Sequence, residues 1–273
     1  MSDTVKQRSF RVDPAMKAAE SKCFAFGEVA FFSAPSPDHP ESNEDSAVVI
    51  ARNTWGVLAV SDGAGGTAGG ALAASMAVEI LQQAACKKTE VQDVRAAILD
   101  AIESADTSIR EKLPGALATM ATFILDGRAA RAISVGDSIC AVIGGRGKIK
   151  YRSIAHGPTG FAEEAGMLEQ GEALTHDERH LVSNMLGLAG MRVEVGIPLK
   201  LAPRDTVLVA SDALFDNVQF DEIAKLAKLR PLVRAVDALV ALAVDRMTGD
   251  GPLSHADDLT ILACRPPKAP VAT

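Results

Sequence analysis

The sequence has little of what a disulfide scaffold, a zinc knuckle or a nucleic-acid-binding domain requires. It contains four cysteines in 273 residues, widely scattered and without a C-x-x-C pair. This spacing argues against zinc-knuckle and redox motifs and predicts reduced, buried thiols. Basic residues number 28 against 35 acidic ones, so the formal net charge is −7. Nucleic acid and anionic membranes both favour a basic surface, and neither is expected as a partner.

Long apolar runs are also missing. No segment approaches the roughly 20 apolar residues that a membrane-spanning helix needs. The opening residues, MSDTVKQRSFRVDP, are polar, so we expect no signal peptide and a cytoplasmic location. Hydrophobic residues nevertheless make up 48 % of the chain, which is enough to form the core of a large domain without disulfide bonds.

The hydrophobic pattern predicts strands and helices in blocks. Helical spacing is found at 73–84, 91–112, 220–229 and 232–247. Strand patterns are found at 23–32, 45–51, 55–60, 117–125, 129–135, 139–143, 149–154, 207–210 and 259–264. Because the two kinds do not alternate regularly, we predict an α+β fold with antiparallel sheets and helices outside them. Residues 1–20 are expected to be a polar lead-in and residues 267–273 a tail.

Five short acidic motifs lie at the ends of the apolar strands. A single carboxylate in such a position is usually a helix cap or a turn residue. Five in one chain need a common explanation, because converging carboxylates repel one another unless a cation lies among them. Oxygen ligands without cysteine or an obvious histidine set favour Mg²⁺ or Mn²⁺ over zinc. The motifs are Asn43-Glu44-Asp45-Ser46, Ser61-Asp62-Gly63, Gly136-Asp137-Ser138, SDALFD at 211–216 and ADDLT at 256–260.

Three other patterns receive plainer interpretations. Residues 63–68 loosely match a G-x-G-x-x-A dinucleotide fingerprint, but the β-α-β alternation that this motif requires is missing. His176 and His180 have the spacing of a zinc edge on a helix, although a solvated surface is the expected interpretation. Ser61, Ser138 and Ser211 each adjoin an aspartate and are expected to form hydrogen bonds in turns, because none lies in a G-x-S-x-G elbow.

The ordered set NEDS, VSDGAGG, SVGDS, VLVASDALFD and ADDLTILAC resembles the motif set of the type 2C metal-dependent Ser/Thr protein phosphatases, the PPM type, in its bacterial form. Each motif alone is weak, but the order of all five over residues 24–264 is specific. The resemblance implies a four-layer α-β-β-α sandwich with two central antiparallel sheets. Residues 21–266 would then be a single phosphatase-like catalytic domain, with a flap at 156–190.

The resemblance also implies two Mn²⁺ or Mg²⁺ ions, with a site for a third. Asp62 would bridge the first two ions, and Asp137 with Asp212 would hold the third. Asp45 would orient the water that the metals activate, so that Asp45 and Asp62 are the catalytic candidates. Asp258 stands where the family usually has asparagine and is not counted as a ligand. The expected ligands are Glu44, Asp62, the carbonyl of Gly63, Asp137, Asp212 and Asp257.

The implied reaction is hydrolysis of phosphoserine and phosphothreonine esters on proteins by a metal-activated water, opposing a Ser/Thr kinase. The arginine with which the family binds phosphate is replaced by Pro40; His39 and Arg52 are the neighbouring candidates for its role. Ala64 replaces a histidine of eukaryotic members, as in many bacterial ones. Pro40 favours an alternative, a pseudophosphatase that binds phosphoproteins or partners without turnover. A phosphatase of small molecules is a third hypothesis.

Overall fold

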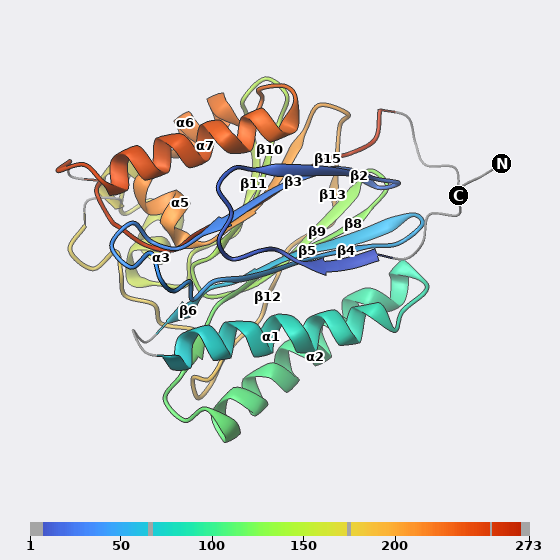
Figure 1. The fold of residues 1–273 in the computed structure, drawn as a ribbon, viewed down its shortest axis with the longest axis horizontal. Coiled ribbons are helices and arrows are strands. Elements are labelled where there is room, and N and C mark those ends of the chain that lie inside the picture. Colours follow the sequence, from blue (N-terminus) through green and yellow to red (C-terminus); the bar gives the residue numbers. More distant parts are fainter. Residues whose placement is uncertain (1–7, 65–67, 174–175, 252, 269–273) are drawn as a thin grey trace.

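The computed structural model describes residues 8–64, 68–173, 176–251 and 253–268. Two antiparallel sheets stack face to face, and helices cover both outer faces, which gives the four layers α-β-β-α (Figure 1). The predicted α+β sandwich is confirmed. No helix in these ranges combines the length and the apolar character needed to cross a membrane.

The first sheet is covered by two long helices, α1 (Ala68–Cys86) and α2 (Val91–Lys112). Its strands lie in the order β1-β4-β5-β8-β9-β12, and β13 also pairs with β9. Their bounds are β1 Arg8–Arg11, β4 Ser46–Ala51, β5 Trp55–Ser61, β8 Met120–Asp126, β9 Ala129–Val135, β12 Glu194–Val195 and β13 Leu199–Lys200.

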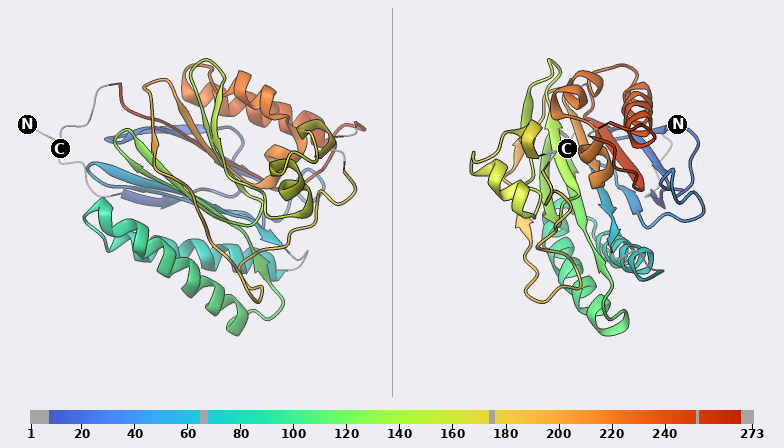
Figure 2. Two further views of the ribbon diagram at one scale, coloured as in Figure 1. Left: turned by 180° about the vertical axis from the view of Figure 1, so that it is seen from behind. Right: turned by 90° about the vertical axis from the view of Figure 1, so that its left-hand side faces the viewer.

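The second sheet is covered by α5 (Asp212–Asn217), α6 (Phe220–Leu226) and α7 (Leu232–Met247). Its order is β11 (Ile149–Arg152), β10 (Ile139–Ile143), β14 (Thr206–Ala210), β15 (Leu259–Arg265), β3 (Gly27–Ala34) and β2 (Glu20–Phe24). A small ribbon pairs β6 (Gly63–Ala64) with β7 (Leu117–Ala118). Two short helices, α3 (Pro158–Glu164) and α4 (Gln170–Ala173), lie outside the sheets at their edge (Figure 2).

Three hydrophobic cores explain why the central strands are apolar at every position. In β4, Val48 and Ile50 face α1 and α2, whereas Val49 and Ala51 face the second sheet. Side chains alternate along a strand, so a strand buried on both faces must be apolar throughout. The continuous runs VVIA and VLAV are therefore a consequence of the sandwich.

Several elements differ from the sequence predictions. Residues 8–11, expected in the lead-in, form β1 on β4, and 23–32 is not one strand. Gly27 begins β3 at φ +151°, where a Cβ would lie 2.2 Å from the carbonyl oxygen of Arg265. That position requires glycine and ends the expected strand. The structure also adds α3, α4, α5, β12 and β13. Predictions for residues 1–7, 65–67 and 269–273 lie outside the described residues.

Candidate metal centre

The predicted ligands meet at one cleft, because the strands that carry them end at the same edge of the sandwich. Asp62 follows β5, Asp137 lies between β9 and β10, and Asp212 follows β14. Each of these three offers a carboxylate oxygen within 4.8 Å of the other two. The cleft is lined by all six predicted ligands, Glu44, Asp62, Gly63, Asp137, Asp212 and Asp257.

The electrostatics of these carboxylates are unfavourable without a cation. Burial raises the pKa of Asp62 well above its ordinary value, and repulsion from Asp45 and Asp137 raises it further. Burial also raises the pKa of Asp212 well above its ordinary value, and repulsion from Asp62 is the next largest cause. Burial also raises the pKa of Asp137 to about 6. A divalent cation would offset the repulsion that these shifts reflect.

Buried carboxylate oxygens without hydrogen-bond partners in the described part of the chain also favour a bound cation. Both carboxylate oxygens of Asp45 and Oδ1 of Asp212 are buried and accept no hydrogen bond within the described part of the chain. Burial raises the pKa of Asp45 well above its usual value, while the nearby hydroxyls of Thr260 and Ser211 lower it. Unpartnered buried acceptors are costly. The oxygen-only donor set fits Mg²⁺ or Mn²⁺.

Hydroxyl groups tie together the strand ends beneath the cleft. Ser61 Oγ donates to the carbonyl of Thr119 at 2.6 Å, and the backbone amide of Asp62 donates to Thr119 Oγ1 at 2.9 Å. Thr119 Oγ1 and Ser138 Oγ are 2.6 Å apart. The three serines form hydrogen bonds, but these bonds join separate strand ends and do not lie within single turns as expected. Thr119 was missed, because a lone threonine between apolar residues gives no signal of this role.

Asp258 holds the loop that carries Glu44. Its Oδ1 accepts the backbone amide of Ser36 at 2.7 Å, and its Oδ2 accepts that of Glu44 at 2.5 Å. Asn43 closes the same loop, since its Oδ1 accepts the amide of Asp45 at 2.8 Å. Both oxygens of Asp258 therefore fix backbone amides, and its exclusion from the ligands stays a prediction.

Two glycines allow Glu44 to enter the cleft. A Cβ on Gly63 would lie 2.3 Å from the backbone of Gly70, so the chain after β5 can approach α1 only without side chains. A Cβ on Gly70 would lie 2.3 Å from Oε2 of Glu44. The carboxylate of Glu44 therefore rests directly on the backbone of α1.

Comparison with known protein families identifies the family of this chain. The model of the protein phosphatase 2C family matches residues 39–239. The chain belongs to the protein phosphatase 2C family. No curated protein matches it.

Solved structures share the protein phosphatase 2C fold. The S. agalactiae serine/threonine phosphatase has a TM-score of 0.76 at 22 % identity, and the match covers 88 % of this chain and 99 % of the other. The Mycobacterium tuberculosis serine/threonine phosphatase PstP/Ppp has a TM-score of 0.70 at 21 % identity, covering 88 % and 98 %. The catalytic domain of PstP in complex with two manganese ions has a TM-score of 0.69 at 19 % identity, covering 87 % and 96 %.

The two candidates for the role of the family's phosphate-binding arginine lie in different places. Arg52 lies away from the cleft: it is buried, it donates to the carbonyls of Ala51 and Cys86, and it stacks on Trp55. His39, the other candidate, lines the cleft. Among the residues that the structure describes, the cleft has three histidines and no lysine or arginine in its wall.

His176 and His180, in the segment expected to be a flap, do not act as a pair. Nδ1 of His176 accepts the amide of Glu178 at 3.1 Å within a turn of the segment. His180 instead lies against His255, with ring centroids 4.7 Å apart. The helical zinc edge that the spacing suggested is therefore not formed by these two residues.

Proposed function

We propose that this protein phosphatase 2C hydrolyses phosphoserine and phosphothreonine esters on proteins and requires Mn²⁺ or Mg²⁺. The carrying observation is the convergence of Asp62, Asp137 and Asp212, whose oxygens lie within 4.8 Å of one another and whose charges repel. The fold neighbours support it, since they are bacterial serine/threonine phosphatases and one holds two manganese ions. An opposing Ser/Thr kinase is the expected source of the substrate.

The proposed ligands divide the cleft into adjacent metal positions. Glu44, Asp62 and the carbonyl of Gly63 would hold one ion, and Asp62 would share a second with Asp212 and Asp257. Asp137 and Asp212 would hold a third. When bound, such ions lower the pKa of water and neutralise charge on the phosphoryl oxygens.

The protein's own side chains would orient the attacking water and hold the metal ligands in place. Asp45, buried beside Asp62, would accept a hydrogen bond from the attacking water and orient it toward phosphorus. Asp258 and Asn43 fix the loop of Glu44 and Asp45 through backbone amides. Thr119 fixes the backbone of Asp62. These contacts set the geometry of the ligands before substrate arrives, which is what positional catalysis requires.

The test is hydrolysis of a phosphothreonine peptide by purified protein with Mn²⁺ or with EDTA. We expect Mn²⁺-dependent turnover that falls by at least ~100-fold in Asp62→Asn and in Asp212→Asn, because the neutral amide binds a hard cation poorly. The matched control, Asp100→Asn on the exposed face of α2, should retain wild-type turnover. Absence of turnover while Mn²⁺ binding persists in calorimetry would favour the pseudophosphatase alternative and make Pro40 its cause.

A further inference from the structure

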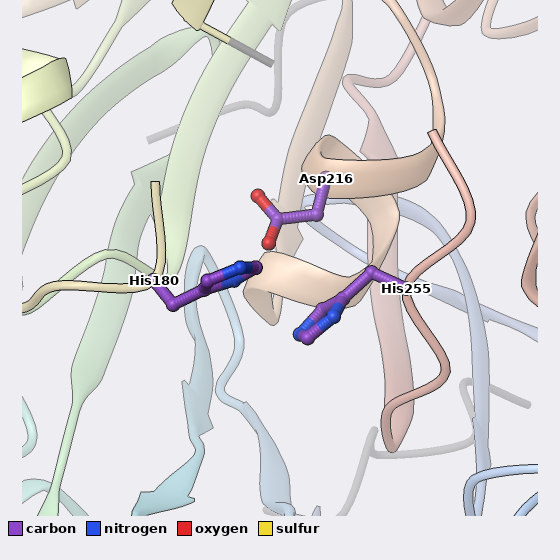
Figure 3. Close-up of side chains that lie close together, drawn as sticks. All are labelled: His180, Asp216 and His255. Carbon is purple, nitrogen blue, oxygen red and sulfur yellow. The ribbon is translucent and has the colours of Figure 1, made fainter. Parts of the chain in front are cut away.

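A second cluster of ligand-type side chains lies beside the carboxylate centre. His180, Asp216 and His255 each offer one nitrogen or oxygen atom within 4.8 Å of the other two. Figure 3 shows the three side chains close together, with the carboxylate of Asp216 on the side of the His180 ring and the His255 ring below them. They come from the segment between α4 and β12, from α5, and from the segment before β15. Three separate parts of the fold thus supply one site.

The donor chemistry differs from that of the catalytic carboxylates. Two imidazoles and one carboxylate suit Zn²⁺ and related transition metals, which bind such sets at ~2.0–2.2 Å with a further position open. Mg²⁺ and Mn²⁺ prefer oxygen ligands. His180 is exposed, whereas Asp216 and His255 are partly buried.

The surroundings of His255 also suit a metal ligand. Its Nε2 lies 3.8 Å from Oδ2 of Asp257, which is an electrostatic contact and not a hydrogen bond. Asn217 fixes the backbone beneath, because its Oδ1 accepts the amide of His255 at 3.0 Å and its Nδ2 donates to the carbonyl of His255 at 2.8 Å.

We propose that His180, Asp216 and His255 bind a transition-metal ion of the Zn²⁺ class at a site adjacent to the carboxylate centre. The ion would fasten the segment around His180 to α5 and to the chain before β15. His180 and His255 also line the cleft; the cleft's described wall has no lysine or arginine, although Arg179 lies close enough to lower the pKa of both His180 and Asp216. A bound ion would add positive charge there and leave a coordination position open to an oxygen ligand.

The experiment uses Co²⁺, a spectroscopic substitute for Zn²⁺, added to EDTA-treated full-length protein carrying Asp62→Asn to weaken the carboxylate centre. We expect one Co²⁺ per chain with the intense visible absorption of a histidine-ligated, four-coordinate ion, displaced by Zn²⁺. Adding His180→Ala or His255→Ala should weaken Co²⁺ binding by at least ~10-fold. His176→Ala, in the same segment, is the matched control and should leave binding unchanged.

Two outcomes would overturn the proposal. The first is Co²⁺ binding that is indifferent to both histidine substitutions, which would place the ion in the carboxylate centre or elsewhere. The second is the absence of Co²⁺ binding to the EDTA-treated Asp62→Asn protein. His180→Gln, together with circular dichroism of every variant, separates loss of a ligand from loss of fold. The readout requires no phosphatase activity, so it stands or fails separately from the proposed function.

Discussion

At the scale of single residues, the carboxylate centre depends on two glycines, Gly63 and Gly70, as much as on its acidic side chains. Glu44 rests on Gly70, and Gly63 packs on the same stretch of α1. The sequence predicted the carboxylates because they end apolar strands, but it did not predict the role of Gly70. A glycine near the start of a helix has no distinctive pattern, and its contact with Glu44 exists only in the folded chain.

Replacing Gly70 with alanine tests this contact. Alanine favours a helix over glycine by ~0.5–1 kcal/mol, but the added Cβ would also lie 2.9 Å from backbone atoms of Gly63, so circular dichroism must accompany the measurement. The new Cβ would displace the flexible end of Glu44, and we expect Mn²⁺ affinity measured by calorimetry to fall ~10-fold. Gly251→Ala, where nothing lies within 4 Å of the added Cβ, is the control. Unchanged affinity in Gly70→Ala would mean that Glu44 is not a ligand.

At the scale of elements, the central strands were predictable and the edge strands were not. Strands β4, β5, β8 and β14 are buried on both faces, so their apolar runs are long and clear. By contrast, β1 is mostly exposed, and β12 and β13 have two residues each. Such strands are defined by pairing with a neighbour, which a local pattern cannot reveal. His180 and His255 are likewise brought together only by tertiary structure.

The hydrogen bonds of Thr119, which join separate strand ends, lead to another prediction. Thr119→Val removes the hydroxyl that accepts the amide of Asp62 and pairs with Ser138. We expect the free energy of unfolding, from urea titration, to fall by ~1–3 kcal/mol, and Mn²⁺ affinity to fall with it. Thr122→Val on β8 is the control, because Thr122 Oγ1 is buried without a hydrogen-bond partner in the described structure. That variant should be neutral or more stable; equal losses in both would contradict this account.

At the scale of the whole molecule, the carboxylate cluster links metal binding to the pH dependence of stability. Burial and neighbouring charges raise the folded-state pKa of Asp137 to about 6 and that of Asp216 to about 7. In the unfolded chain these groups ionise near their ordinary value of ~3.9. Between these limits the folded state holds more protons than the unfolded state, so the stability of the metal-free protein falls as pH rises.

The melting temperature of EDTA-treated protein should therefore be lower at pH 8 than at pH 5. Mn²⁺ should raise it more at pH 8, where protons no longer compete for the carboxylates. Asp62→Asn removes one of the repelling charges, and without metal at pH 8 it should melt above the wild type. A metal-free protein that is more stable at pH 8 than at pH 5 would show that the cluster does not control stability.

The position of β15 has a consequence for the order of folding. This strand lies inside its sheet, between β14 and β3, and the hydroxyls of Thr260 and Ser33 meet across 227 positions of sequence. As the polypeptide leaves the ribosome, β3 emerges long before the strand that must cover its edge. Contacts over such separations form slowly, and exposed edges favour aggregation until they form. The nascent chain would therefore gain a complete metal centre only after residues 257–265 have emerged and inserted.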